Sequence, residues 1–288
     1  MRTVEECTFG IVGLGLMGGA IAIALREKCG VARERLLACD KDFETLDNAL
    51  QDGFIACGWE ADKAGEMISS CDVVFLCLNP SAIIRFLERY AGSFKPGSLV
   101  TDIAGTKSSI AEAARKFRGD VDFIPGHPMA GAEKGGFANS RLCNFNGKNY
   151  ILAPLSRNKP ENLEFLKNLI YGMGFGRITE VSPAEHDRKI AFTSQLCHVI
   201  AAALVDCEDD TTITRFGGGS FEDLTRIAML NAPMWTEIFI ENRDALLDRI
   251  GQFEASLDAL KTLIENAQAA ELEKRLAVVR DRRTAMTN

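Results

Sequence analysis

The chain has 288 residues, of which 47% are hydrophobic and 25% charged, and its formal net charge is −7 at pH 7. This composition is typical of a folded globular protein. The acidic balance argues against nucleic acid or an anionic membrane surface as a partner, because either would need a concentrated basic face. We therefore expect a small-molecule partner.

The cysteines and the N-terminal segment bear on the cellular compartment. There are nine cysteines, an odd number, and no two of them have C-x-x-C spacing. Several lie in apolar runs, where a thiol behaves as a small hydrophobic group, so we expect reduced core residues in a cytoplasmic protein. The N-terminus has a charge pair before its apolar run and leads straight into structure, so we expect no signal peptide. Residues 9–25 are uncharged but number only 17 and include five glycines, so we expect no membrane span.

The first part of the chain alternates between two kinds of segment. Strand-like runs are followed by helical stretches, which is typical of βαβ units and a parallel sheet. The strand-like runs are 7–13, 35–40, 71–78, 97–103 and 121–126, and the helical stretches are 18–28, 43–53, 81–94 and 108–119. Two more strand-like runs, 148–154 and 175–182, complete a domain that we expect to span residues 1–181.

The second part has helical patterns and no strand-like run. Ser182 and Glu185 have the capping-box spacing that predicts the start of a long helix over 183–207. Further helices are predicted at 221–230, 233–268 and 270–283, so residues 182–288 are expected to form an all-helical domain. Phe253, Leu257, Leu260, Ile264 and Ala267 fall on one stripe, as a packed helix or an intersubunit seam requires. A ligand site is expected between the two domains.

A glycine motif lies where the first strand meets the first helix. It reads Gly13-x-Gly15-x-x-Gly18, with Leu16 and Met17 opening the helix. Its glycines allow a tight turn, close approach of the backbone to a pyrophosphate, and close helix–strand packing, and the helix N-terminus presents unpaired N–H groups to the phosphates. Because strand, helix and a second strand ending in an acid all fit, we predict an α/β fold with a Rossmann-type dinucleotide-binding domain.

The acid at the end of the second strand bears on the choice of cofactor. Asp40 can hydrogen-bond the adenosine ribose hydroxyls and repel a 2′-phosphate, which favours NAD over NADP; alternatively it caps the following helix. The adjacent Lys41 weakens this discrimination, so NADP stays an alternative. Asn79 and Pro80 follow another strand and are expected to line the same crevice.

Residues 125–136, "PGHPMAGAEKGG", contain one of only three histidines in the chain. The glycines and prolines around His127 predict an irregular segment rather than a regular helix or strand. It follows the strand-like run 121–126, so His127 is expected at the carboxyl edge of the sheet. A neutral imidazole there can act as a general base.

Four motifs, in this order behind the glycine motif, resemble the prephenate dehydrogenase family of tyrosine biosynthesis. They are "HPMAGAEKGG", "SQLCHVIAAAL", "GGGSFEDLTRIA" and "PMWTEIFIEN". The resemblance covers essentially the whole chain. It implies NAD-dependent oxidative decarboxylation of prephenate to 4-hydroxyphenylpyruvate, without a metal, by a homodimer joined through its helical domains.

The resemblance also implies roles for individual residues of the first domain. His127 matches the family's catalytic histidine, and Glu133 matches an acid that orders the loop or contacts substrate. In "TDIAGTK" the register places Gly105 where the family often has a serine whose hydroxyl contacts the histidine and substrate. Thr106 is a candidate substitute for that hydroxyl, and Lys107 is either a substrate-binding residue or a solvated helix-start residue.

In the second domain the resemblance assigns a substrate pocket. Ser194 and His198 match residues that line the pocket, and with Asp187 and Ala191 they are spaced to share one helix face. His186 is interpreted as structural. Arg226 matches the arginine that binds a substrate carboxylate, for which a guanidinium fork is well suited. Trp235 matches a motif residue at the substrate pocket or the domain interface.

Three other functions remain as alternatives. Arogenate dehydrogenase differs only in the amino group on the substrate side chain. A β-hydroxyacid dehydrogenase shares the glycine motif, but its helix would carry a lysine and an asparagine where this chain has the histidine motif. A non-catalytic NAD-binding sensor would not need His127 and Arg226 in separate domains.

Overall fold

The computed structural model describes residues 3–115, 121–132 and 134–286. Its largest sheet has six parallel strands in the order β3-β2-β1-β4-β5-β6, which is the Rossmann arrangement. The strands are β1 (Phe9–Val12), β2 (Leu36–Asp40), β3 (Cys57–Glu60), β4 (Val73–Leu76), β5 (Leu99–Asp102) and β6 (Asp122–Ile124). The strand β3 was not predicted, because "CGWE" is short and its residues are exposed or only partly buried.

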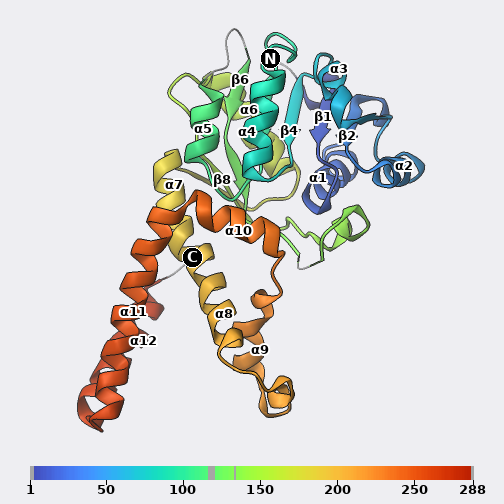
Figure 1. Cartoon of the computed structure of the whole chain (residues 1–288). Helices are drawn as coiled ribbons and strands as arrows, with labels where there is room; N and C mark the ends of the chain where they lie inside the picture. Colours follow the sequence, from blue (N-terminus) through green and yellow to red (C-terminus); the bar gives the residue numbers. More distant parts are fainter. Residues whose placement is uncertain (1–2, 116–120, 133, 287–288) are drawn as a thin grey trace.

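Helices cover both faces of this sheet (Figure 1). They are α1 (Leu16–Glu27), α2 (Phe43–Gln51), α3 (Ala64–Ile68), α4 (Pro80–Tyr90), α5 (Ser108–Ala114) and α6 (Pro160–Gly172). Successive side chains of β1 point to opposite faces, so Ile11 belongs to one hydrophobic cluster and Val12 to the other. Burial on both faces explains why the central strands are continuously apolar.

A second, three-stranded sheet adjoins the first domain's core. It consists of β7 (Gly126–Pro128), β8 (Asn149–Leu152) and β9 (Arg177–Glu180), with β7 antiparallel and β9 parallel to β8. The prediction that the segment around His127 excludes a regular strand is therefore wrong for Gly126–Pro128. The strand β7 lies at the edge of its sheet, and an edge strand tolerates proline, which has no N–H to donate to the ladder. Gly126 has no room for a side chain, since a Cβ there would lie 2.8 Å from the Tyr150 ring.

The remaining regular elements are all helical over residues 183–285, within the described chain. They are α7 (Pro183–Ile190), a π turn (Ala191–Gln195), α8 (Leu196–Asp206), α9 (Gly219–Thr225), α10 (Ala232–Glu241), α11 (Arg243–Glu265) and α12 (Ala269–Ala285). Short 3-10 segments occur at Val4–Glu6, Arg33–Arg35, Ala61–Lys63, Phe137–Leu142, Thr211–Phe216 and Arg226–Ala228. Ser182 caps α7 as predicted, its hydroxyl accepting a hydrogen bond from the Glu185 amide.

Two predicted helices are interrupted in the structure. The helix over 183–207 contains the π turn, and the helix over 233–268 breaks at Asn242. The Asn242 side chain is buried and donates hydrogen bonds to the Asp187 carbonyl and the Gln195 amide oxygen. One polar side chain therefore joins the two interruptions, which no local helix pattern could predict.

Helices α11 and α12 lie side by side and project away from the sheets (Figure 1). The apolar stripe of α11 is largely uncovered in the single chain, with Leu257 53% and Ile264 64% exposed. Among the described residues, one helical segment, Pro183–Asp206, is long and apolar enough to cross a bilayer by length and composition alone. Only 28% of its most apolar window is buried within the chain.

All nine cysteines are free thiols. Four are buried, in agreement with their apolar sequence context, and Cys29 and Cys77 are partly buried. Cys57, Cys197 and Cys207 are exposed, so the prediction that the cysteines are core residues is wrong for these three.

Candidate functional site

The glycine loop between β1 and α1 has the geometry that a dinucleotide requires. Gly13 has φ +89°, and a Cβ on it would lie 2.6 Å from the Cys77 carbonyl oxygen. A Cβ on Gly18 would overlap the carbonyl oxygen of Gly13, so this glycine permits close helix–strand packing. Gly15, by contrast, faces open space at the N-terminus of α1. The loop therefore leaves room for a pyrophosphate beside the helix N-terminus.

The carboxylate of Asp40 reaches this loop from the end of β2. It accepts a hydrogen bond of 2.6 Å from the Leu14 amide, which places a negative charge beside the glycine motif. Lys41 is exposed. Asn79 and Pro80 form the start of α4, immediately after β4. The loop, the acid and the α4 start thus meet at the carboxyl ends of the parallel strands, where such folds bind nucleotides.

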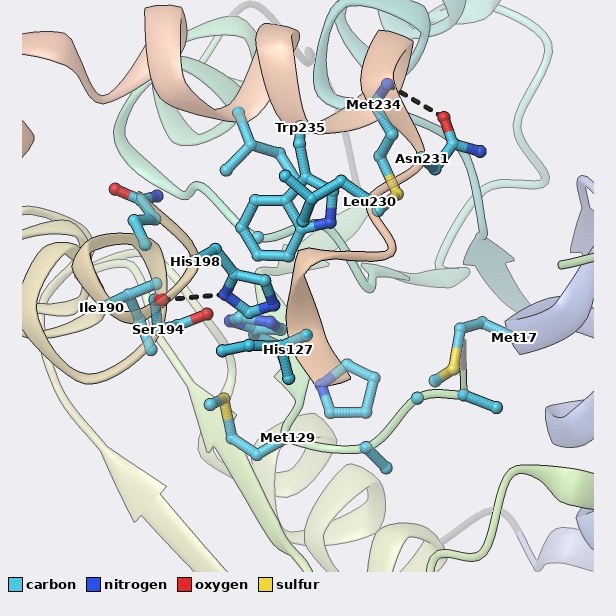
Figure 2. A pocket seen from close by; sticks show the side chains of 18 of the residues that line it. Met17, His127, Met129, Ile190, Ser194, His198, Leu230, Asn231, Met234 and Trp235 are labelled. Carbon is cyan, nitrogen blue, oxygen red and sulfur yellow. Dashed lines mark hydrogen bonds between the residues drawn. The ribbon is translucent and has the colours of Figure 1, made fainter. Parts of the chain in front are cut away.

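A cavity of about 560 Å³ lies between the sheets and the helical part. Figure 2 shows side chains from both parts pointing into it, among them His127, His198 and Trp235. Its lining includes Met17 of α1, His127 of β7, Ser194 of the π turn, His198 of α8, Arg226, and Trp235 of α10. The structure therefore brings together five of the predicted residues, and Met17 connects the cavity to the glycine loop; the five are His127, Ser194, His198, Arg226 and Trp235.

His127 is the first member of a chain of hydrogen bonds. Its Nδ1 lies 2.9 Å from Nε2 of His186, and Nδ1 of His186 lies 2.8 Å from the Asp187 carboxylate. Burial is the main cause that lowers the pKa of His127 well below its usual range, and the nearby His186 and Lys107 lower it further. His127 is therefore neutral at physiological pH and can accept a proton.

The Asp187 carboxylate at the end of this chain is firmly held. It accepts hydrogen bonds of 2.8 Å from the Lys107 amide and from the Ser108 amide. Burial raises its pKa, but hydrogen bonds from His186 and Ser108 outweigh burial, and the pKa is lowered overall. Asp187 is therefore ionised, and it also borders a second cavity of about 500 Å³.

His198 is oriented by two neighbours. Its Nδ1 lies 2.9 Å from the Ser194 carbonyl, and its ring stacks on Trp235. Burial lowers its pKa, and the charge of Arg226 lowers it further against the opposing effect of the Ser194 carbonyl. His198 and Arg226 both line the cavity.

The segment 102–107 differs from expectation. Lys107 is fully buried and forms an ion pair with Asp102, so it neither lines the cavity nor lies in solvent. The Thr106 hydroxyl is buried and has no hydrogen-bond partner among the described residues, and Thr106 does not line the cavity either. Gly105 does line it, so no hydroxyl from this segment faces the cavity. Neither Thr106 nor Lys107 is positioned for the role predicted from the sequence.

The expected shared helix face is also corrected. Ser194 and His198 face the main cavity, whereas Asp187 does not line it. In the π turn the Leu196 amide bonds to the Ala191 carbonyl, one residue further back than in an α-helix, which rotates the following residues. Glu133 lies outside the described residues.

Sequence reasoning missed the roles of His186 and Asp102. His186 was interpreted as structural, but it contacts His127 directly. Asp102 holds Lys107 and accepts hydrogen bonds from the Ala104 and Gly126 amides, so it fixes the turn beside β7. No local sequence signal indicates the contact of His186 with His127; the other two histidines of the chain line the cavity.

Comparison with known proteins gives the same assignment for both parts of the chain. Residues 21–179 match the family model described as prephenate dehydrogenase, nucleotide-binding domain, and residues 182–278 match prephenate dehydrogenase, dimerization domain. Prephenate dehydrogenase of Bacillus subtilis is 31% identical over 97% of this chain and 76% of that protein.

Two solved structures are similar over almost their whole length. Prephenate dehydrogenase from A. aeolicus, solved in complex with hydroxyphenyl propionate and NAD+, is 28% identical with a TM-score of 0.83, covering 97% of this chain and 98% of that one. Synechocystis arogenate dehydrogenase is 29% identical with a TM-score of 0.79, covering 97% and 99%. With its Rossmann sheet, its helical second part and a histidine-bearing cavity between them, the chain belongs to the prephenate dehydrogenase family.

Proposed function

We propose that this enzyme catalyses the NAD-dependent oxidative decarboxylation of prephenate to 4-hydroxyphenylpyruvate in tyrosine biosynthesis. One observation carries the proposal: a neutral histidine, His127, shares a cavity with the cation Arg226, and Met17 of the glycine-loop helix lines the same cavity. This arrangement suits a substrate with a hydroxyl to deprotonate and carboxylates to bind. Asp40 beside the glycine loop supports NAD rather than NADP.

His127 acts on the C4 hydroxyl of the cyclohexadienol ring. Bound NAD+ supplies the acceptor for the hydrogen and electron pair that leave C4. As that C–H bond breaks, His127 takes the hydroxyl proton and stabilises the developing carbonyl character at C4. Breaking the bond to the ring carboxylate releases CO2 and returns an electron pair to the ring, which becomes aromatic. His127 then gives the proton back to the phenolate oxygen, so the reaction has no net proton release.

The cavity residues that come from the helical part bind the substrate's carboxylates. Arg226 can fork onto one carboxylate with two parallel hydrogen bonds. His198 and Ser194 offer further polar contacts from α8 and the π turn. Trp235 supports the His198 ring by stacking and excludes water from one wall.

The chain is proposed to act as a cytoplasmic homodimer. We divide it into a dinucleotide-binding domain, residues 1–181, and a substrate and dimerisation domain, residues 182–288, because β9 ends at Glu180 and α7 begins at Pro183. The exposed apolar stripe of α11 and the uncovered segment Pro183–Asp206 support burial against a second copy of the chain rather than in lipid.

A steady-state assay of reduced nicotinamide absorbance tests the reaction. Prephenate and arogenate are each offered with NAD and with NADP. We expect the highest kcat/KM for prephenate with NAD; turnover of arogenate alone would reassign the substrate, and turnover of neither would refute the proposal. His127→Asn should lower kcat about 100- to 10,000-fold while NAD affinity is unchanged.

Sedimentation equilibrium tests the dimer. The double variant Leu257→Glu/Ile264→Glu puts charges on the exposed stripe and should yield monomers, whereas Lys63→Glu, on an exposed residue of the first domain, should remain dimeric. A monomeric parent protein would contradict the proposal.

A further inference from the structure

We propose that His186 and Asp187 are positioning residues that hold His127 in the tautomer with a proton on Nδ1 and a free lone pair on Nε2, facing the cavity. The inference deepens the proposed function, because it explains why His127 is a base rather than a hydrogen-bond donor. It rests on the hydrogen-bonded series His127, His186 and Asp187. Of these three residues, the sequence alone assigned only His127 to the chemistry.

The direction of each hydrogen bond follows from the outer end of the series. An ionised carboxylate can only accept, so Asp187 requires the proton of the 2.8 Å bond to be on Nδ1 of His186. A neutral His186 then has its lone pair on Nε2. The proton of the 2.9 Å bond to His127 must therefore be on Nδ1 of His127. The other ring nitrogen of His127, Nε2, is left as the acceptor.

Both charge states needed for this assignment are supported by the surroundings. Burial is the main cause that lowers the pKa of His186, so this imidazole is neutral. Burial raises the pKa of Asp187, but hydrogen bonds from His186 and Ser108 outweigh burial, so the carboxylate is ionised; the Lys107 amide also donates to it. Lys107 is in turn tied to Asp102, so the segment 102–107 serves as a clamp for the Asp187 carboxylate.

The series also affects the transition state. When His127 takes the hydroxyl proton it becomes an imidazolium whose Nδ1–H points at the His186 lone pair, with the Asp187 charge behind it. This negative charge stabilises the cation without taking the proton away, which suits a reaction that returns the proton to the product oxygen. The logic is that of the serine protease triad, in which replacing the aspartate by asparagine reverses the tautomer and costs about 10,000-fold in kcat.

Long-range 1H–15N NMR of the imidazoles tests the tautomer directly. The chain has only three histidines, so the spectrum is simple, and His127→Asn and His198→Asn variants assign it. We expect His127 to be protonated on Nδ1 and unprotonated on Nε2 from pH 8 to pH 6. Protonation on Nε2 in the parent protein would overturn the inference. This measurement needs no turnover, so its outcome is separate from that of the proposed reaction.

Asp187→Asn tests the consequence. The carboxamide can donate to Nδ1 of His186, which reverses both hydrogen bonds and puts a proton on Nε2 of His127. We expect the NMR signature to switch and kcat to fall about 100- to 10,000-fold, while KM for substrate and for NAD changes little. An unchanged kcat would contradict the inference.

Asp122→Asn is the matched control. Asp122 is a buried carboxylate that also accepts several hydrogen bonds, but its partners are Asn158, Lys159 and Asn162 rather than a histidine. Any general effect of a buried Asp→Asn change on stability should appear in both variants. Only Asp187→Asn should change the His127 tautomer and kcat; equal losses of kcat in both would show that the role of Asp187 is merely structural.

Discussion

The imidazole of His198 lies against the indole of Trp235, with ring centroids 3.7 Å apart and 29° between the ring planes. His198 belongs to α8 and Trp235 to α10, so this contact joins two helices on one wall of the cavity. The orientation of the imidazole therefore depends on a residue 37 positions later in the chain, the difference between 235 and 198.

The stack predicts that Trp235 reports on substrate binding. The chain has two tryptophans, so Trp59→Phe leaves Trp235 as the single emitter. Its fluorescence should change when prephenate or a product analogue fills the cavity. Trp235→Leu should lower kcat/KM about 2- to 10-fold, the value of an aromatic contact. The control is Trp235→Phe, in which the remaining Trp59 emission should not respond; a silent Trp235 at saturating ligand would contradict the assignment.

Arg226 is expected to dominate substrate affinity. Removing the guanidinium in Arg226→Ala leaves a substrate carboxylate unpaired. We expect kcat/KM to fall by the equivalent of about 2–5 kcal/mol of binding free energy, mostly through a higher KM. Arg226→Lys keeps the charge but loses the fork, so it should recover only part of this loss. Arg115→Ala removes an exposed arginine that pairs with Glu112, and it should leave both constants unchanged.

Substitution of two glycines of the loop is expected to affect two different properties, NAD binding and thermal stability. Gly15→Ala places a Cβ in open space, so thermal stability should be retained while NAD binding weakens. Gly18→Ala forces a Cβ onto the Gly13 carbonyl and should lower Tm. Gly92→Ala, also in open space but away from the loop, should affect neither property. Titration calorimetry with NAD and thermal denaturation measure the two effects, and normal NAD affinity in Gly15→Ala would contradict the predicted site.

Asp40 is expected to determine the choice between NAD and NADP. In Asp40→Asn the negative charge that would repel a 2′-phosphate is removed, so the ratio of kcat/KM for NADP to that for NAD should rise about tenfold, equivalent to about 1.4 kcal/mol. Asp47→Asn, on the exposed side of α2, should not change the ratio. If the ratio of kcat/KM for NADP to that for NAD is unchanged in Asp40→Asn, the prediction is wrong.

The buried histidines predict a loss of stability on acidification. The folded protein lowers the pKa of His127 and of His186 below the ordinary value of 6.5, whereas the unfolded chain restores it. As pH falls below 6.5 these histidines bind protons in the unfolded state but not in the folded state. The free energy of unfolding therefore decreases, by up to about 1.4 kcal/mol per pH unit for each histidine. Urea denaturation at pH 8, 6.5 and 5.5 measures the slope. It should be smaller in His127→Asn; a free energy of unfolding that stays constant to pH 5.5 would argue against neutral histidines.

Much of the fold could be predicted because the signals are local. The central strands are continuously apolar, and the glycine motif and the Ser182 cap depend on neighbours within a few residues. The strand β3 and the helix α3 were missed, because each is short and has little pattern of its own. His127 was expected in an irregular segment, but pairing with Ile151 of β8, far away in the sequence, makes it part of a strand.

The site was predictable where a motif carries it and not where partners from distant segments decide. His127, His198, Arg226 and Trp235 line one cavity as the family resemblance implies. Lys107 was expected to be available for substrate, but in the structure it is buried and forms an ion pair with the nearby Asp102. His186 looked structural, because nothing in the local sequence indicates that its Nε2 meets His127.

The π turn at Ala191–Gln195 has a consequence for how the helix α7–α8 can change. An extra residue in one turn offsets the helix surface by about 100°, so His198 faces the main cavity whereas Asp187 faces away from it and contacts His186. Substitutions on the α8 half can reshape the substrate's surroundings without disturbing the residues behind the base. A deletion within the turn would couple the two again, and would turn either the carboxylate or the substrate-facing histidine away from its partner.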